Sequence, residues 1–269
     1  MVAGMGEWMR QRPVSRVLVF VWTVLLLLSA CGGTPEPNVP EREEKLTARQ
    51  ALGDLRTLDA CTLTDPEALK ELGSVRDAGT VSLDYCLHHL RLDDGSRVQL
   101  ATGELRQASN VDDGGAPVVR RGGMRIVRDS PLPGHCTRQV LFDDGLALQV
   151  NVDLLDGDPA AGLCRVAEAG AESVVRAIQD KQVGHRELPP HSLALADPCS
   201  ALASELVQQV PGLDKAKGRS TPSNHRCLWG TEAASQPRVR LTYTAGDPPK
   251  RLHATAVEEQ IAGRRTVIS

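Results

Sequence analysis

Two segments of the chain begin with cysteine and share one spacing to Asp-Asp-Gly, and this repeat strongly constrains the fold. Cys86 leads to Asp93-Asp94-Gly95, and Cys136 leads to Asp143-Asp144-Gly145. Apolar residues resume after each Asp-Asp-Gly, and glycine supplies the positive φ that a tight turn needs. Each segment is therefore predicted to be a β-hairpin whose first strand begins at its cysteine. Cys227 opens a third segment of this kind, with a longer turn.

A second repeated pattern places Asp-x-Cys before a short helix and a glycine. It occurs at 59–61 and again at 197–199. In the first copy Thr64 and Glu67 are predicted to form a capping box, and Pro66 lies in the first helical turn, where its missing N–H costs little. The chain therefore contains one complete unit, 46–183, and part of a second.

The N-terminus has the pattern of an export signal. Arg10, Arg12 and Arg16 precede or flank a short apolar run that is followed by two small residues and Cys31. The run is too short for the ~20 residues that a membrane-spanning helix needs. Residues 28–31, Leu-Ser-Ala-Cys, resemble the lipobox of bacterial lipoproteins.

This resemblance implies cleavage before Cys31 and lipidation of its sulfur. The protein would then lie on the extracytoplasmic face of the cell membrane, anchored by lipid. An ordinary signal peptide with a cysteine near its cleavage site is the alternative.

Six cysteines remain outside the signal, an even number that is typical of disulfides in an exported protein. Fifteen pairings are allowed. Nearly equal separations of 25, 28 and 28 residues favour the sequential pairs Cys61–Cys86, Cys136–Cys164 and Cys199–Cys227. Neither Cys-x-x-Cys nor a His-x-x-x-His cluster is present, so neither a zinc site nor a thiol-redox site is indicated.

Five segments of the chain follow from these signals and from composition. Other periodic or capped segments predict helices at 47–57, 160–179 (capped by Asp158-Pro159) and 201–210, and strands at 118–119, 124–126 and 266–268. The expected organisation is a signal peptide, 1–30; a proline-containing tether, 31–45; a disulfide-stapled α+β domain, 46–183; a linker, 184–191; and a partial second α+β copy, 192–269.

The expected fold class is α+β, an antiparallel sheet of hairpins packed against helices in an α/β sandwich. The second copy ends before any equivalent of the Cys136–Cys164 half. A truncated reading frame is favoured over a natural half-domain, because a final Val-Ile strand would leave an apolar edge unpaired.

Charge and composition exclude several partners. Removing the predicted signal, whose net charge is +2, from the chain's −3 leaves −5. A mildly acidic protein has no electrostatic footprint for nucleic acid or for an anionic bilayer surface, so the acyl chains must hold it to the membrane. Aromatic residues are scarce, which argues against a platform that stacks sugars or bases.

Asp197-Pro198-Cys199-Ser200, followed by Cys227-Leu228-Trp229, resembles an actinobacterial family of cell-envelope lipoproteins of unknown function. The first unit follows the same order with two departures, Ala60 for proline and His88 for tryptophan. The resemblance implies an envelope location. Related envelope domains are α/β sandwiches, some implicated in binding lipid or cell-wall ligands and others in sensing.

No catalytic constellation, metal site or cofactor site is predicted. His88 and His89 face opposite sides of a strand and are expected to be surface residues, and His135 lies beside a cysteine. Asp153 and Asp156, with Asp158, have calcium-like spacing but lack the required glycine and glutamate. Solvated loop and helix-cap roles are expected for them.

Two function classes remain. One is a non-enzymatic binding or sensor module for an apolar small ligand, a cell-wall component or an envelope protein. The other is a cell-wall-modifying enzyme with dispersed catalytic residues. A cleft with two or more converging titratable side chains would favour the enzyme.

Overall fold

The computed structural model describes residues 45–79, 82–108, 118–158, 162–233, 235–245, 254–261 and 263–268. The predicted signal peptide, Cys31 and nearly all of the tether lie outside the described residues. In the part of the chain that is described, no helix combines the length and apolarity needed to cross a membrane.

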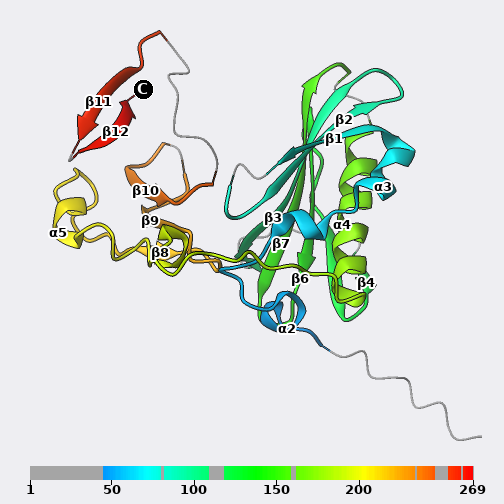
Figure 1. Ribbon diagram of the computed structural model, residues 1–269, viewed down its shortest axis with the longest axis horizontal. Coiled ribbons are helices and arrows are strands. Elements are labelled where there is room, and N and C mark those ends of the chain that lie inside the picture. The colour runs from blue at the N-terminus through cyan, green and yellow to red at the C-terminus, as the bar shows by residue number, and fades with distance from the viewer. Residues whose placement is uncertain are drawn as a thin grey trace, which may run out of the picture. The chain divides into compact units, whose positions relative to one another are not determined.

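A seven-stranded antiparallel sheet forms the centre of the structure (Figure 1). Its spatial order is β1-β2-β3-β7-β6-β5-β4. The hairpins predicted to start at Cys86 and Cys136 are confirmed as β2–β3 and β6–β7, and they meet in the middle where β3 pairs with β7. The strands are β1 (Gly73–Gly79), β2 (Cys86–Leu92), β3 (Arg97–Gln107), β4 (Val119–Arg121), β5 (Met124–Arg128), β6 (His135–Leu141) and β7 (Leu146–Asp156).

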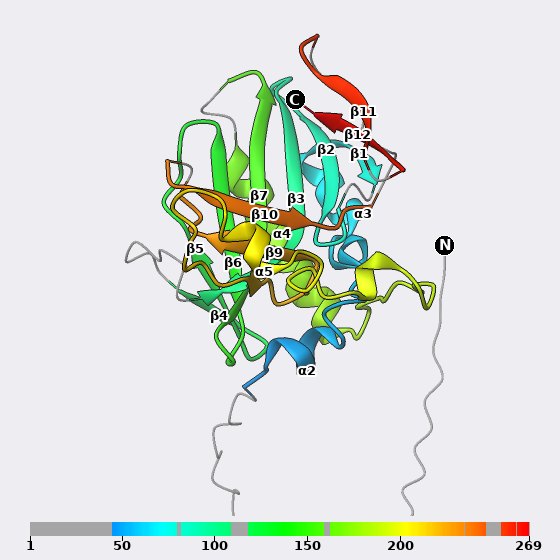
Figure 2. The ribbon, with the colours of Figure 1, turned by 90° about the vertical axis from the view of Figure 1, so that its left-hand side faces the viewer.

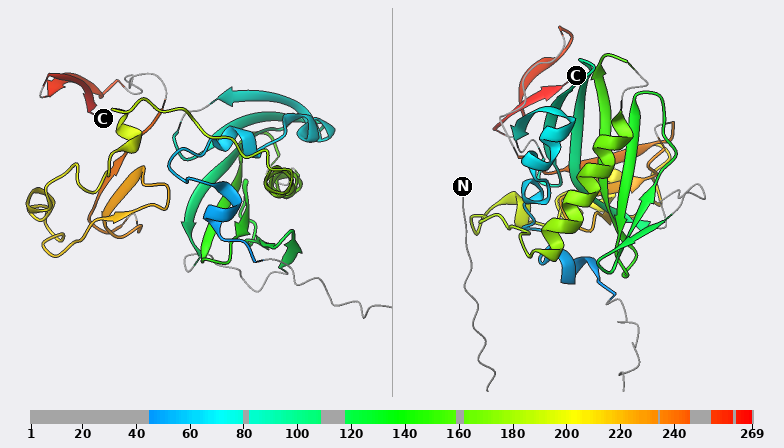
Figure 3. Two further views of the ribbon diagram at one scale, coloured as in Figure 1. Left: turned by 60° about the horizontal axis from the view of Figure 1, so that its bottom comes forward. Right: turned by 90° about the vertical axis from the view of Figure 1, so that its right-hand side faces the viewer.

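One long helix, α4 (Leu163–Gln179), covers one face of this sheet (Figure 3). Alternate residues of the strands bury apolar side chains against it. Gly170 allows the close approach, because a Cβ there would lie 2.8 Å from Val150 Cγ1. The predicted start of this helix is wrong: its N-cap is Gly162, and Asp158 instead donates its backbone N–H to Ser96 Oγ.

The remaining helices are short. The predicted capping box at Thr64 is wrong, because Asp65 is the N-cap and its carboxylate accepts the N–H of Glu67 at 2.9 Å. The helices predicted over 47–57 and 201–210 form only single turns. The short α-helices of the described residues are α2 (Ala48–Leu52), α3 (Pro66–Leu69) and α5 (Ser204–Val207). Single 3-10 turns lie at Ala60–Leu63, Lys70–Leu72 and Leu193–Leu195.

Two smaller sheets follow in the sequence (Figure 2). The first contains β8 (Arg219–Ser220), β9 (Arg226–Gly230) and β10 (Arg238–Thr242), which confirms the hairpin predicted from Cys227. The second pairs β11 (Val257–Ile261) with β12 (Arg264–Ile268). The expectation that the Val267-Ile268 strand is unpaired is therefore wrong, because β11 pairs with it.

All three predicted disulfides are present: Cys61–Cys86, Cys136–Cys164 and Cys199–Cys227. Cys136–Cys164 joins β6 to α4 and so fastens the helix to the sheet. The structure is dominated by antiparallel sheet, with few helices and three disulfides. Apart from α4, the helices expected to form a second layer are single turns.

Candidate functional site

A groove of about 470 Å³ lies on the sheet face opposite α4, and we call it the sheet-face groove. Its walls come from four strands, β2, β3, β6 and β7, together with Tyr85 before β2 and Asp129 after β5. A volume of this size is typical of sites for small molecules. The lining is formed by Tyr85, Leu87, Gln99, Ala101, Glu104, Arg106, Asp129, His135, Thr137, Gln149, Asn151 and Asp153.

The two-residue period of strands explains why this face is polar. Along β7, Leu148, Val150 and Val152 point to the core, so the intervening Gln149, Asn151 and Asp153 point to the groove. Along β6, His135, Thr137 and Gln139 occupy the same face. The antiparallel register places these two polar sets opposite one another, as His135↔Asp153, Thr137↔Asn151 and Gln139↔Gln149.

A chain of hydrogen bonds crosses β6 and β7 within the groove. His135 Nδ1 lies 2.6 Å from Asp153 Oδ1, and His135 Nε2 lies 2.8 Å from Thr137 Oγ1. The Thr137 hydroxyl donates to Asn151 Oδ1 at 2.8 Å. The order carboxylate, imidazole, hydroxyl is that of a nucleophilic triad. Thr137 is only 5% exposed, however, and its hydroxyl is bonded on both sides, so the chain orients these groups and presents no nucleophile.

Glu104 reaches the groove because β3 has a bulge. The register of β3 with β7 shifts between Thr102 and Leu105, so Gly103 and Glu104 together lie opposite one residue, Gln149. Gly103 has φ 128°, and a Cβ on it would come within 2.6 Å of Ala60 Cβ, so the bulge requires glycine. Glu104 then pairs with Arg106 at 3.4 Å and with Arg226 at 3.1 Å.

Two glutamines lie side by side on this face and are almost fully buried. Gln139 is 3% exposed and Gln149 is 7% exposed, and both side-chain oxygens are buried without a hydrogen-bond partner. Gln139 Nε2 donates to both oxygens of Asp129, at 3.0 and 2.9 Å. This contact fixes the orientation of the amide, because the flipped form would place an oxygen against a carboxylate.

The other predicted histidines lie outside the groove. His88 and His89 face opposite sides of β2 as expected, but His88 is buried rather than a surface residue. Burial lowers the pKa of His88, although the nearby Asp77 charge opposes this. His88, Asp77 and Cys86 place ligand atoms within 4.8 Å of one another. Cys86 is bonded to Cys61, so this cluster offers no thiolate to a metal.

The three carboxylates with calcium-like spacing have separate partners. Asp153 contacts His135, and Asp156 pairs with Arg97 at 3.3 Å. The Asp158 backbone N–H bonds to Ser96 Oγ. The structure therefore places Asp153 in the groove and the other two residues outside its lining.

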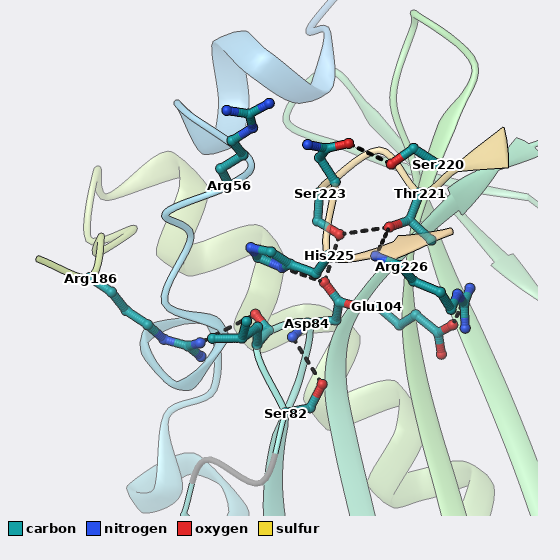
Figure 4. Close-up of polar contacts among 12 residues, drawn as sticks. Arg56, Ser82, Asp84, Glu104, Arg186, Ser220, Thr221, Ser223, His225 and Arg226 are labelled. Atoms are coloured by element: carbon teal, nitrogen blue, oxygen red, sulfur yellow. Dashed lines mark hydrogen bonds and ion pairs between the residues drawn. The ribbon is translucent and has the colours of Figure 1, made fainter. Parts of the chain in front are cut away.

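A second polar cluster links the large sheet to the three-stranded sheet (Figure 4). Ser223 Oγ donates to Asp84 Oδ1 at 2.6 Å, and His225 Nδ1 lies 2.8 Å from the same oxygen. Burial alone would raise the pKa of Asp84, but the hydrogen bonds from His225 and Ser223, with the nearby His225 and Arg226 charges, lower it. Both donors converge on the carboxylate rather than on each other, which makes the cluster a structural link.

Most groove residues could not be assigned to a site from the sequence, because the apolar residues of these strands predict the core and the polar residues between them predict only an exposed face. The available signal was the series of polar residues at alternate positions in both strands of the hairpin between His135 and Asp153. The predicted lipidation site, Cys31, lies outside the described residues. No family model matches the chain, and neither a curated protein nor a solved structure does.

Proposed function

We propose that the protein is an extracytoplasmic lipoprotein, held to the cell membrane by acyl chains on Cys31, that binds a polar ligand in the sheet-face groove. It acts as a non-enzymatic binding or sensor module of the cell envelope. The carrying observation is the sheet-face groove of about 470 Å³, whose lining is almost entirely polar and includes the carboxylates of Glu104, Asp129 and Asp153.

The chemistry of the groove bears on the ligand class. Its lining contains charged residues, amides and hydroxyls, with only Leu87 and Ala101 purely apolar. An apolar ligand would bury these polar groups without partners, which is unfavourable. This favours a cell-wall component over an apolar small molecule.

Titratable side chains do converge in the groove, which is the feature expected for the enzyme alternative. His135 and Asp153 are in direct contact, and Glu104 lines the same groove. The only hydroxyl in the chain of hydrogen bonds, that of Thr137, is buried and already donates to Asn151. A rigid, fully bonded platform of this kind favours recognition over bond cleavage.

We also propose that residues 192–269 form a partial second copy of the first domain, and that both copies are similar to the domain of the actinobacterial envelope family. Asp59 Oδ1 accepts the N–H of Cys61 at 3.2 Å, and Asp197 Oδ1 accepts the N–H of Cys199 at 3.0 Å. In both places the cysteine is bonded to the cysteine that opens a hairpin strand. The same local turn and the same staple support a common origin and the predicted α/β sandwich.

Anchoring is tested with a Cys31→Ala variant. The variant should leave the membrane fraction and lose labelling by radioactive palmitate. Palmitate label retained in the variant would contradict the lipoprotein proposal.

Ligand binding is tested on the soluble full-length Cys31→Ala protein, titrated with a muramidase digest of actinobacterial cell walls. The side-chain amide NMR signals of Gln149 and Asn151, which line the groove, should shift, while those of Gln208, which does not line it, should not. Signals of Gln149 and Asn151 that stay unchanged across the titration would contradict binding of cell-wall material at the groove.

A further inference from the structure

A second cavity, of about 740 Å³, is lined by the last residues of β3 and by the three-stranded sheet, and we call it the arginine cavity. A volume of this size is typical of sites for small molecules. Leu105, Pro222 and Leu228 give it an apolar wall. Its charged lining residues are three arginines, Arg106, Arg219 and Arg226, and one glutamate, Glu232.

The register of the three-stranded sheet explains why arginines gather on one of its faces. Arg219 of β8 lies directly opposite Leu228 of β9, and Arg226 precedes Leu228 by two residues, so all three side chains share a face. The other face carries Cys227 and Trp229, which belong to the small apolar core. Because diagonal neighbours on one face are within reach of long side chains, the guanidiniums of Arg219 and Arg226 can bind one group together.

The carboxylates near this cavity do not balance its guanidinium charges. Arg106 and Arg226 share one carboxylate, that of Glu104, at 3.4 and 3.1 Å, and the contact of Arg226 is drawn in Figure 4. Arg219 donates to a backbone carbonyl at 2.8 Å and has no carboxylate partner in the described part of the chain. Three positive charges are thus accompanied by two negative ones, those of Glu104 and Glu232, although the chain as a whole is acidic.

All three guanidiniums remain accessible to a ligand. Arg219 is exposed, and the side chains of Arg106 and Arg226 are 45% and 17% exposed. Guanidinium groups bind carboxylates and phosphates through paired N–H donors. An anion that enters the cavity can therefore use donors of Arg219 that no carboxylate occupies.

We propose that the arginine cavity binds a phosphate-bearing ligand through Arg219 and Arg226, with Arg106 beside them. A phosphate group carries up to two negative charges and three acceptor oxygens, so it can accept from several guanidiniums at once. A carboxylate has a single charge, which one guanidinium neutralises. The apolar wall suits the organic part of such a ligand. This site goes beyond the proposed function, because it is separate from the sheet-face groove although Arg106 lines both.

The experiment uses inorganic pyrophosphate as the probe. It is titrated by calorimetry, at physiological ionic strength, into the Cys31→Ala protein processed so that the signal is removed. We expect one pyrophosphate to bind per protein, and acetate at the same concentration to bind far more weakly. In NMR spectra the Nε–H signals of Arg219 and Arg226 should shift, while the side-chain amide signal of Asn151 in the sheet-face groove should not.

An Arg219→Gln substitution removes the guanidinium that has no carboxylate partner. It should lower the affinity for pyrophosphate at least about fivefold. The matched control is Arg240→Gln, because Arg240 is an exposed arginine that lies opposite Leu228 on the other side and does not line the cavity. The control should leave the affinity within about twofold, since solvent ions screen a distant exposed charge. Both variants should keep the urea midpoint of Trp229 emission, which separates lost binding from lost folding.

Several outcomes would overturn the inference. One is no binding of pyrophosphate, and another is equal weakening by the two variants, which would show unspecific attraction to an arginine-rich face. Acetate that binds as tightly as pyrophosphate would identify a carboxylate site instead. A shift of the Asn151 signal with unchanged arginine signals would place the anion in the sheet-face groove. The cell-wall digest tests the groove separately, so the two proposals can fail independently.

A last arm of the experiment identifies the source of the phosphate. Vesicles of phosphatidylcholine with phosphatidic acid, compared with phosphatidylcholine alone, are added before the pyrophosphate titration. Competition by the phosphatidic acid vesicles would support a lipid headgroup as the ligand. Pyrophosphate binding that is unchanged by both kinds of vesicle would support a soluble phosphate compound.

Discussion

His225 Nδ1 lies 2.8 Å from the carboxylate of Asp84, although the two residues are 141 positions apart in the sequence. Asp84 precedes β2 of the seven-stranded sheet, whereas His225 directly precedes β9 of the three-stranded sheet. His225 is only 1% exposed, and Ser223 donates to the same oxygen. Because a buried carboxylate with two donors is costly to break apart, this contact stabilises the association of the two sheets.

Removing that carboxylate should loosen the C-terminal part of the chain. We expect Asp84→Ala to destabilise the link by about 2–3 kcal/mol, because His225 and Ser223 are left buried without their shared acceptor. Limited proteolysis should then cut residues 192–269 faster while residues 46–183 persist. The control, Asp156→Ala, breaks an exposed ion pair and should change the cleavage rate little. Equal cleavage rates for the two variants would contradict a linking role for Asp84.

Glu168 fastens α4 to the strands beneath it, and its removal should weaken the whole domain. Its carboxylate accepts from Arg128 at 2.7 Å and from Arg138 at 2.7 Å, and the Arg138 side chain is only 8% exposed. Glu168→Gln should lower the free energy of unfolding by about 2 kcal/mol, because Arg138 loses its buried counter-charge. Urea unfolding followed by circular dichroism measures this. A urea midpoint equal to that of the parent protein would show that the ion pairs of Glu168 make no net contribution to stability.

Stability should fall in acid in two steps with different causes. Burial alone would raise the pKa of Glu168, but the hydrogen bonds and charges of Arg128 and Arg138 lower it, and the Asp84 pKa is also lowered. Such carboxylates stabilise the fold above their unfolded pKa, about 4, and lose this contribution as pH falls through the lowered folded value. Burial lowers the pKa of His88, so its protonation in the unfolded chain already favours unfolding below about pH 6.5.

The measurement is Tm as a function of pH for three variants. His88→Leu should flatten the curve just below about pH 6.5, the usual pKa of histidine in the unfolded chain. Glu168→Gln and Asp84→Asn should flatten it below about pH 4, and at neutral pH both should lie below the parent. A parent curve that stays level from pH 7 down to pH 3 would contradict the assignment of these groups.

Local signals in the sequence predicted more than non-local ones. The turns at Asp93–Gly95 and Asp143–Gly145 contain the glycine that their geometry needs, so the two hairpins were predictable. The three disulfide pairings were predicted from the nearly equal sequence separations of successive cysteines. The capping of α3 was misplaced by one residue, because Thr64 and Asp65 are both good N-caps and only the fold selects between them.

The groove and the polar link depend on contacts between distant segments. Glu104 joins the groove through a bulge whose position depends on β3 pairing with β7, about fifty residues later. His225 reaches Asp84 only after the three-stranded sheet has docked. No local pattern specifies either relation, which is why the alternating polar residues of β6 and β7 could not show from the sequence that they line a site.

The Cys199–Cys227 bond should carry much of the stability of the three-stranded sheet. The buried apolar core around this bond is small, consisting of Val207, Leu213, Cys227 and Trp229. A small core gives marginal stability, and closing a loop of 28 residues by a disulfide contributes roughly 3–4 kcal/mol. A Cys199→Ala/Cys227→Ala variant should therefore unfold in this region first.

The fluorescence of Trp229 reports the unfolding of the three-stranded sheet directly. It is 1% exposed, and the other two tryptophans, Trp8 and Trp22, lie in the predicted signal peptide. In the variant, processed so that the signal is removed, Trp229 emission should shift to the red at lower urea than the circular dichroism of the seven-stranded sheet changes. The matched control is Cys61→Ala/Cys86→Ala, which removes a disulfide of the large sheet. In this control, the circular dichroism of the seven-stranded sheet should change at lower urea than Trp229 emission. Coincident transitions in both variants would show that the two sheets unfold as one cooperative unit.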